Sequence, residues 1–437
     1  MSSFELLSRL EPAFGKIEEA VKNDHEFQAS ANGHAVAFGI TADDNTKPVI
    51  VTVENGRIQL DSGPHLKPSF TLSARTEHWE EFFEAVPKRP FQSYWGMLRI
   101  LGKVEGVEIV GDVAAFGRYA RLWRIILDRI RDALHGQDTA YRPEDVVVDF
   151  DEEDSIVGRY ITAEQPRWGR CKIFYETAGS GPQDILFLHT AGSDSRQYHA
   201  LMEDKQLRRR CTMYAFDLPG HGRSFLGSKQ MPENFTNDEE QYVGIIGQVI
   251  QKLKLKKPIV SGASMAGHVC LAVALRAKEL GVSGVIPCEG CDHLPAAAAI
   301  YDMPGDPAIL DPERVCGMIA PTAPAENKRL IWWTYSSQGV QVFNGDLRFY
   351  FRGWDGRDRM QNIDTSICPV YMLTGEFDYS CTAEASEATA KKIPGAKFEK
   401  MIGLGHFPMS EDTKAFIPYL TKGIEYIQTH LGSSSRS

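Results

Sequence analysis

Hydrophobic and polar positions along residues 158–432 follow two alternating patterns. Unbroken apolar runs of strand length recur, and the stretches between them carry apolar residues at helical spacing, as at Tyr242, Ile245, Ile246, Val249, Ile250 and Leu253. Strands separated by helices predict an α/β fold, a doubly wound and mostly parallel sheet with helices on both faces. The predicted strands are Cys171–Ala178, Asp184–His189, Thr212–Asp217, Pro258–Gly262, Gly284–Pro287, Val370–Gly375 and Lys397–Ile402.

The first 136 residues show a different pattern and predict a smaller α+β domain. Apolar and polar residues alternate at His34–Thr41 and again at Val49–Leu60, where Asn55-Gly56 is typical of a tight hairpin turn. Two further strands are predicted at Phe70–Ser73 and Val107–Val110. Helices are predicted at residues 1–20, Trp79–Ala85 and 113–134.

Changes of composition along the chain predict its domain boundaries. Residues 137–157 are acidic and contain a proline, which is typical of a linker. We therefore expect the α+β domain at 1–136 and the α/β core at 158–290 and 361–432. Residues 291–360 are long for a connection between strands, so they predict a helical cap insert.

Charge and cysteine content limit the classes of partner. The formal net charge of −10 disfavours nucleic acids and anionic membranes, because both repel a negative surface. No apolar run approaches the roughly 20 residues of a membrane span, and the N-terminus lacks the apolar region of a signal peptide. The eight scattered cysteines fit reduced thiols in the cytoplasm. Cys288-x-x-Cys291 lacks a second half-site, so we expect no metal and no cofactor.

The stretch VSGASMAGHVC, residues 260–270, predicts a strand, a sharp turn and a helix with Ser264 at the corner. Small residues at Gly262, Ala266 and Gly267 let the strand and the helix approach closely. A serine in such a corner exposes its Oγ above the sheet, and the following helix points its N–H groups and positive dipole end toward it. Ser264 is therefore the candidate nucleophile.

A serine nucleophile needs a base, an acid and an oxyanion site. His406 follows the last predicted strand on a glycine-flanked loop and is the candidate base. Asp378 follows the strand before it and is the candidate acid, with Glu289 as the alternative. The backbone N–H groups of Met265 and Ala191 are the expected oxyanion donors.

The loop after Asp184–His189 and the cap supply candidate pocket residues. Thr190 is a second choice as oxyanion donor, and His189 is expected to brace this loop. Aromatic residues of the cap could line a substrate pocket, although most of them are expected to form the cap's own core. The candidate pocket residues are His189, Thr190, Trp332, Trp333, Tyr335 and Tyr379. The charged cap residues Asp346, Arg348, Arg352, Asp355, Arg357 and Asp358 are expected to form a solvated or self-paired network.

The motifs LFLHTAGSDS, FDLPGHGRS, GASMAGH, LTGEFDYS and GLGHF occur in this order. With them, residues ~158–432 resemble an α/β-hydrolase-fold serine hydrolase, which implies the triad Ser264, Asp378 and His406. The stretches PSFTLSARTEHWEEFF and FQSYWGMLRILGKVEGVEIVGDVAAFGRY resemble a sterol-carrier-protein type 2 domain. That second resemblance implies an apolar tunnel for a lipid-like ligand. The alternative is a module that packs against the second domain or mediates a homodimer.

These observations predict a serine hydrolase that cleaves an ester or lactone of an apolar, aromatic or polyketide-like small molecule. A C–C bond hydrolase acting on a 1,3-diketone would use the same triad and stays open. A non-catalytic receptor or carrier for an apolar ligand is the alternative from a different class.

Overall fold

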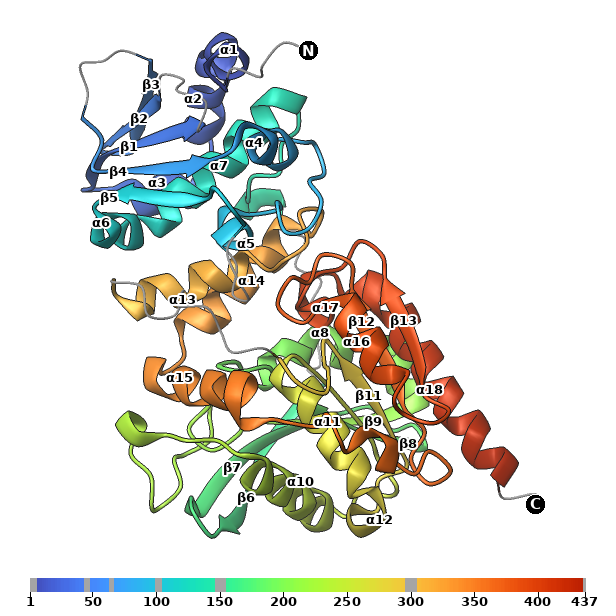
Figure 1. Cartoon of the computed structure of the whole chain (residues 1–437). Coiled ribbons are helices and arrows are strands. Elements are labelled where there is room, and N and C mark those ends of the chain that lie inside the picture. Colours follow the sequence, from blue (N-terminus) through green and yellow to red (C-terminus); the bar gives the residue numbers. More distant parts are fainter. Residues whose placement is uncertain are drawn as a thin grey trace. The chain divides into compact units, whose positions relative to one another are not determined.

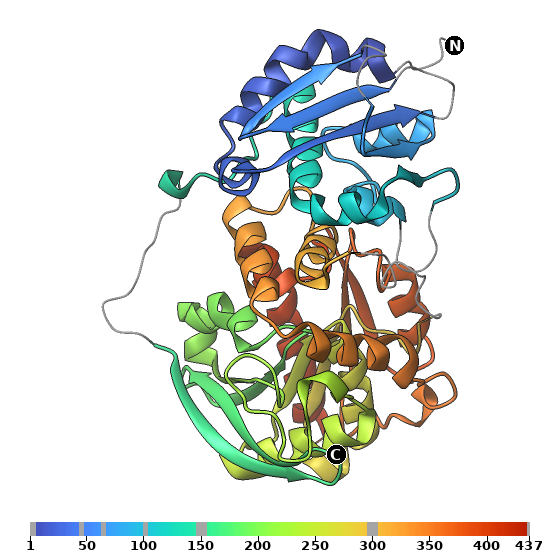
Figure 2. The same cartoon turned by 90° about the vertical axis from the view of Figure 1, so that its left-hand side faces the viewer.

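The computed structural model describes residues 6–42, 48–62, 67–98, 104–145, 155–294 and 305–434. These residues form two compact units (Figures 1 and 2). The first unit combines the described residues up to 145 with residues 305–332. The second unit combines residues 155–294 with residues 333–434.

A five-stranded sheet in the order β3-β2-β1-β4-β5 forms the centre of the first unit. β1 and β4 run parallel, and the other neighbouring strands run antiparallel. Asn55 and Gly56 join β2 to β3 with φ of 49° and 78°, as a tight hairpin turn requires. The strands are β1 (Ala35–Ala42), β2 (Val49–Glu54), β3 (Arg57–Asp61), β4 (Phe70–Ala74) and β5 (Glu108–Gly111).

Helix α7 (Ala120–His135) carries the apolar stripe predicted within residues 113–134. Its residues Trp123, Ile126 and Ile130 are buried, and the helix packs against α2 and α3. Gly136, with φ of 64°, ends the helix in the left-handed conformation that favours glycine. The other helices before residue 145 are α1 (Leu6–Leu10), α2 (Phe14–Lys22), α3 (His25–Ala31), α4 (Thr76–Phe82), α5 (Tyr94–Leu98) and α6 (Val113–Arg118).

Two helices from much later in the chain complete the first unit. α13 (Pro307–Cys316) packs against α6 and α7, and most of α14 (Ala325–Ser336) belongs to the same unit. The hydroxyl of Ser93 donates to the carbonyl of Gly317 at 2.8 Å. The sequence predicts one cap insert at 291–360, whereas the structure groups residues 305–332 with the first unit.

The second unit has the predicted doubly wound, mostly parallel sheet. Its strand order is β13-β12-β11-β10-β8-β9-β7-β6. The six strands from β13 to β9 run parallel, and β7 and β6 are antiparallel to their neighbours. The strands are β6 (Val157–Gln165), β7 (Gly169–Ala178), β8 (Gln183–Leu188), β9 (Cys211–Phe216), β10 (Ile259–Ala263), β11 (Gly284–Cys288), β12 (Tyr371–Gly375) and β13 (Lys397–Met401).

Helices cover both faces of this sheet, and α15 belongs to the segment predicted as the cap (Figure 1). α8 and α18 pack together over the sheet, and so do α10 and α11. The helices are α8 (His199–Glu203), α9 (Lys205–Arg210), α10 (Glu239–Leu253), α11 (Met265–Leu275), α12 (Ala277–Leu280), α15 (Val340–Arg348), α16 (Ala383–Ala390), α17 (Pro408–Glu411) and α18 (Thr413–Ser434).

Strand β6 was not predicted, and the expected linker at 137–157 ends where this strand begins. β6 pairs with β7 alone at the sheet edge, and most of its side chains are exposed. It therefore lacks the apolar pattern by which a buried strand is identified. Residues 146–154 of the expected linker lie outside the described residues.

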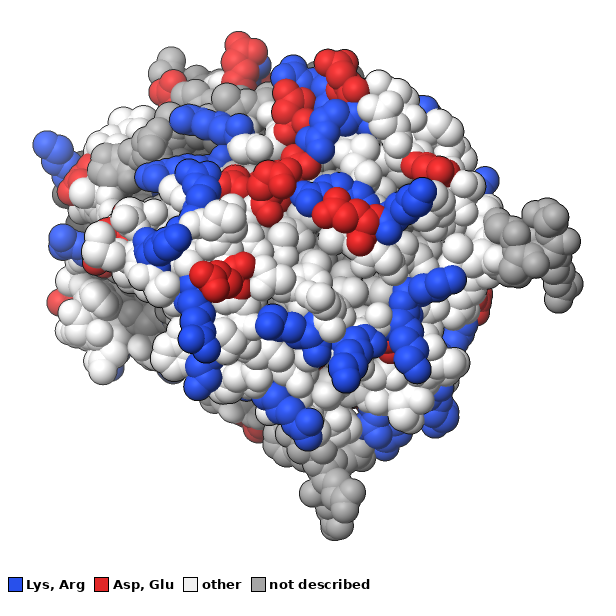
Figure 3. Space-filling model, turned by 90° about the horizontal axis from the view of Figure 1, so that it is seen from below, with Lys and Arg blue, Asp and Glu red and all other residues white. Residues whose placement is uncertain are grey.

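In the described ranges, no helix has the length and apolar character needed to cross a membrane. Figure 3 shows side chains of both signs on one face of the molecule, with the lower half of the view carrying mainly lysine and arginine. Positive side chains are thus concentrated in one half of this face.

Candidate active site

Ser264 occupies the corner between β10 and α11. Its φ of 61° and ψ of −123° are unusual for a residue with a side chain, and the residue is only 4% exposed. A Cβ on Gly262 would lie 2.6 Å from the Cβ of Ala266, and one on Gly267 would lie 2.1 Å from the carbonyl oxygen of Cys288. The predicted small residues are therefore required by close packing at this corner.

His406 and Asp378 meet through the loops that follow β13 and β12. Nδ1 of His406 lies 2.8 Å from Oδ2 of Asp378, and both side chains are buried. Oδ1 of Asp378 accepts hydrogen bonds from the backbone N–H groups of Ser380 at 2.7 Å and Cys381 at 3.2 Å. The carboxylate is thereby fixed in the orientation that receives the imidazole N–H.

His406 also lies near the helix that begins after Ser264. Burial, with a smaller contribution from the neighbouring His406, lowers the pKa of His268 on α11 to about 3. The N–H of His268 donates to the carbonyl of Ser264 at 3.1 Å. Within the described ranges, Ser264 Oγ and His406 are not hydrogen-bonded; such bonds are often long until a substrate binds.

Glu289, the alternative acid, has a different environment. It lies fully buried after β11, and its Oε1 accepts from the N–H of Gly375 at 3.1 Å. Burial, and then repulsion from Asp378, raise its pKa well above the usual value. Because a neutral carboxyl cannot stabilise an imidazolium as a carboxylate does, the geometry favours Asp378 as the partner of His406.

His189 braces the loop after β8, as the sequence suggests. Its Nε2 accepts from the N–H of Leu218 at 3.1 Å, so its Nδ1 carries the proton and donates to the carbonyl of Thr190 at 2.8 Å. Burial lowers its pKa to about 4, which keeps the ring neutral. The N–H of Thr190 donates to Oε1 of Gln197 at 3.0 Å, which leaves Ala191 as the candidate oxyanion donor of this loop.

Asp346 corrects the expectation of a solvated charge network in the cap. It is fully buried, and its Oδ2 accepts from Nε2 of His221 at 2.7 Å and from the N–H of Gly192 at 3.0 Å. Oδ1 accepts from Asn237 at 3.0 Å. Asp355, by contrast, is exposed and paired with Arg357, as expected. Asp346 therefore anchors the residue after Ala191 to helix α15.

Glu411 is a second buried acid that the sequence reasoning missed. Its carboxylate accepts hydrogen bonds from the N–H of Gly405 and, at 3.4 Å, from the N–H of Phe407. These are the two neighbours of His406. The signal available in the sequence was its position five residues after His406, and in the structure it is the last residue of α17.

The candidate pocket residues on the cap and near Asp378 differ in how far they are buried. Tyr335 is buried, its hydroxyl bonds to that of Thr190, and its ring lies 5.6 Å from the ring of Phe407. Phe407 in turn lies edge-on to His406 at 4.8 Å. Tyr379 is buried, whereas Trp333 is 49% exposed beneath the guanidinium of Arg196.

Trp332 is the last residue of segment 305–332 and therefore belongs to the first unit. Of the remaining cap aromatics, Phe343, Phe349, Tyr350, Phe351 and Trp354 are buried, in agreement with the expectation that most of them form a core.

Comparisons with known proteins agree with this architecture. A model of the alpha/beta hydrolase family matches residues 185–418, which is more than half of the chain. An uncharacterized protein of Mycobacterium tuberculosis (strain H37Rv) is 23% identical over 287 residues, covering 59% of this chain and 81% of the relative.

Two solved esterase structures resemble the chain over 62% of its length. An esterase from Thermogutta terrifontis is 20% identical, with a TM-score of 0.50 and 99% of its own chain covered. A carboxylesterase from the thaumarchaeon Nitrososphaera gargenis is 15% identical, with a TM-score of 0.51 and 99% of its chain covered. At these identities the two structures show a common fold.

Proposed function

Because the chain belongs to the alpha/beta hydrolase family and is an enzyme of the hydrolase type, we propose that it cleaves a carboxylic ester or lactone through an acyl-enzyme on Ser264. The observation that carries this proposal is the buried hydrogen bond between Nδ1 of His406 and Asp378. It orients the imidazole as a serine hydrolase requires, in a chain whose Ser264 stands at a strand–helix corner.

In the proposed reaction, Nε2 of His406 takes the proton of Ser264 while Oγ attacks the carbonyl carbon. Asp378 holds the tautomer and stabilises the imidazolium that forms. The backbone N–H groups of Met265 and Ala191 donate to the oxyanion of the tetrahedral intermediate. Collapse releases the alcohol, which receives the proton from His406, and water then attacks the acyl-enzyme by the same route to release the acid.

An apolar, aromatic or polyketide-like molecule is the proposed substrate class. The support is the row of rings that begins at His406 and continues through Phe407 to Tyr335 and Phe343. Aromatic walls favour substrates with large apolar faces, while the few polar groups set their orientation.

For the first unit we propose a role in handling an apolar ligand. The support is the resemblance of its strand and helix order to a sterol-carrier-protein type 2 domain, together with a core rich in aromatic side chains such as Trp79, Trp95 and Trp123. The competing role is a homodimer contact. Gel filtration of the full chain at two concentrations tests it, because a dimer that dissociates on dilution would favour that role.

The test is the variant Ser264→Ala, measured with p-nitrophenyl acetate. We expect loss of at least three orders of magnitude in kcat/KM with an unchanged circular dichroism spectrum, because the nucleophile is missing. The exposed Ser366→Ala serves as control and should keep full activity. A fluorophosphonate should label Ser264 in the unchanged protein, detected by mass spectrometry.

The same assay addresses the alternatives. A receptor or carrier would give neither a burst of p-nitrophenol nor a labelled serine. A C–C bond hydrolase would turn over a 1,3-diketone faster than esters of the same size. If Ser264→Ala retains more than about a tenth of the activity, the acyl-enzyme proposal is wrong.

A further inference from the structure

An open cavity of about 390 Å³ lies within the first unit, between helices of the N-terminal segment and the late helices α13 and α14. This volume falls in the range of small-molecule sites. Side chains of Ala29, Leu122, Ala308 and Ile309 form its apolar wall. The rest of the wall is dominated by arginine and by Trp332.

Three arginines line this cavity. Two of them contact the ring of Trp332: the guanidinium of Arg121 is 3.8 Å from its ring centre, and that of Arg329 is 4.6 Å away. Arg118 is exposed and forms no ion pair with any described residue. Such cation–π contacts order both guanidinium groups, and those of their N–H groups that do not face Glu26 can donate to a planar anion.

The carboxylates nearby are already engaged. Both oxygens of Glu313 are bonded, one to Arg124 and the other to Nε1 of Trp332 at 2.7 Å. Glu26 is shared by Arg124 at 2.7 Å, Arg121 at 3.3 Å and Arg329 at 3.9 Å. Asp128 lies 3.7 Å from Arg124, so that with Arg118 four guanidinium groups face three carboxylates, and the cluster has an excess of positive charge.

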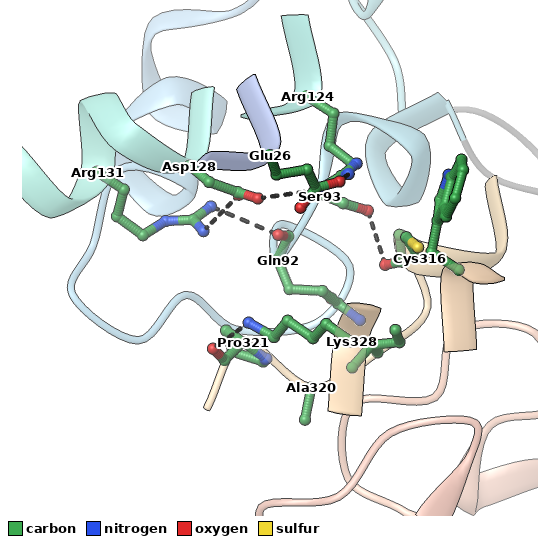
Figure 4. A pocket seen from close by; sticks show the side chains of 13 residues that line it. Glu26, Gln92, Ser93, Arg124, Asp128, Arg131, Cys316, Ala320, Pro321 and Lys328 are labelled. Atoms are coloured by element: carbon green, nitrogen blue, oxygen red, sulfur yellow. Dashed lines mark hydrogen bonds and ion pairs between the residues drawn. The ribbon is translucent and has the colours of Figure 1, made fainter. Parts of the chain in front are cut away.

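A smaller neighbouring cavity, of about 50 Å³, is also lined by several positively charged side chains (Figure 4). Figure 4 shows Arg124 beside Glu26, Arg131 beside Asp128, and Lys328 reaching toward Pro321. Nζ of Lys328 donates to the carbonyl of Pro321 at 2.9 Å, and burial lowers its pKa. The two cavities share Trp332, and cations outnumber carboxylates around both.

We propose that the larger cavity binds a small amphiphilic anion, in which a carboxylate or another oxyanion is attached to an aromatic or aliphatic group. The oxyanion accepts charge-assisted hydrogen bonds from Arg118 and Arg329 and offsets the excess charge of the cluster. The apolar part lies against Leu122, Ile309 and the edge of Trp332. This site lies outside the α/β sheet unit and is independent of the acyl-enzyme chemistry proposed above.

The experiment titrates the full-length protein with benzoate, benzamide and benzamidine by calorimetry. The three probes share a ring but carry negative, neutral and positive charge. Benzoate should bind with one site per chain, and benzamidine should not bind. Acetate, which keeps the carboxylate and lacks the ring, should bind at least tenfold more weakly than benzoate.

Two variants of arginines that line the cavity test whether benzoate binds there. Arg118→Glu and Arg329→Gln should each weaken benzoate binding about tenfold or more, because each removes a charge-assisted contact. Arg159→Gln, on the exposed face of β6, is the control and should leave the affinity unchanged. Since Arg118 is exposed, its variant is expected to fold, which a circular dichroism melt checks.

Binding of benzoate and benzamidine with similar affinity would overturn the proposal, and so would the absence of benzoate binding up to 10 mM (about 2.7 kcal/mol). Equal affinity of Arg118→Glu and the unchanged protein would also overturn it, since benzoate would then occupy another site. None of these binding measurements depends on the esterase activity of Ser264→Ala. A negative result for anion binding would therefore leave the proposed hydrolase function untouched.

Discussion

Nδ1 of His406 lies 2.8 Å from Oδ2 of Asp378, and the other oxygen of this carboxylate is held by two backbone N–H groups. The imidazole therefore has one nitrogen bonded to a fixed acceptor and the other available for proton transfer. This pair is the part of the candidate site that can be tested most directly by isosteric replacement.

Asp378→Asn should reduce kcat by about 10⁴-fold, because an amide in this place favours the wrong tautomer of His406. Glu289→Gln should reduce it less than about threefold, since burial raises the pKa of Glu289 and so favours the neutral form, which an amide imitates. Steady-state kinetics on one activated ester compares the two variants. The reverse ranking would assign the acid to Glu289.

Glu411→Gln should lower kcat about tenfold with little change in KM, because the carboxylate that ties Gly405 and Phe407 also positions His406 between them. An amide offers one acceptor oxygen where two are used. A purely structural role would instead lower the melting temperature and leave kcat per folded molecule intact. Glu387→Gln, at a half-exposed position on α16, is the matched control.

Asp346→Asn should destabilise the fold by about 3 kcal/mol or more and lower the activity of the remaining folded protein. The amide keeps one acceptor oxygen, but its NH2 group then faces either His221 and Gly192 or Asn237, all of which donate. Asp355→Asn removes an exposed ion pair instead and should change stability by less than about 0.5 kcal/mol. Urea unfolding of both variants measures the difference.

Two buried histidines, His189 and His268, should each contribute stability that rises with pH between about 4 and 6.5. The pKa values of His189 and His268 are lowered by burial to about 4 and about 3, so the unfolded chain binds more protons than the folded one in this range. Each histidine then contributes a slope of about 1.4 kcal/mol per pH unit, and its stabilisation is complete above 6.5. His268→Gln should remove one such slope, whereas the exposed His25→Gln should not.

The buried pair of His221 and Asp346 should change the pH dependence of stability in the opposite direction. Although burial opposes the charge, the Asp346 carboxylate raises the pKa of His221 above its ordinary value. Its stabilisation is therefore complete below the unfolded-state pKa of about 6.5 and is lost as pH rises through the folded-state pKa. Urea titrations above pH 6.5 should show this decline, and it should be absent in Asp346→Asn.

Removal of residues 1–145 should cause aggregation, because α13 then loses α6 and α7, and α14 loses contacts such as that of Trp332 with Arg121. Removal of 1–145 together with 305–332, bridged by a glycine-serine linker, should give a monodisperse protein with the complete sheet. Gel filtration with light scattering compares the two truncations. A monomeric first truncation would contradict this expectation.

Local signals predicted much of the fold. Asn55-Gly56 marks its hairpin because few residues adopt two successive positive φ angles. The strand and helix around Ser264 follow from small residues whose replacement would clash. The catalytic roles of Ser264, Asp378 and His406 stay predictions, since local pattern and chain order suggest a mechanism without testing it.

The remainder depends on contacts between distant residues. Asp346 lies in a charged segment that is typical of solvated surface, and its burial depends on His221, 125 positions earlier. The grouping of 305–332 with the first unit depends on pairs such as Arg124 with Glu313, which are 189 positions apart. A single sequence carries no record of such pairings, and β6 gives no apolar signal because its edge is exposed.

During synthesis, the ribosome delivers residues 6–145 long before α13 and α14. Roughly 190 residues separate the end of the first segment from Trp332, and at about 5–20 residues per second their translation takes about 10–40 s. Until residues 313 and 317 are made, Arg124 lacks Glu313, and Ser93 lacks the carbonyl of Gly317. The unit that begins the chain therefore completes its packing only after most strands of the second sheet have been made.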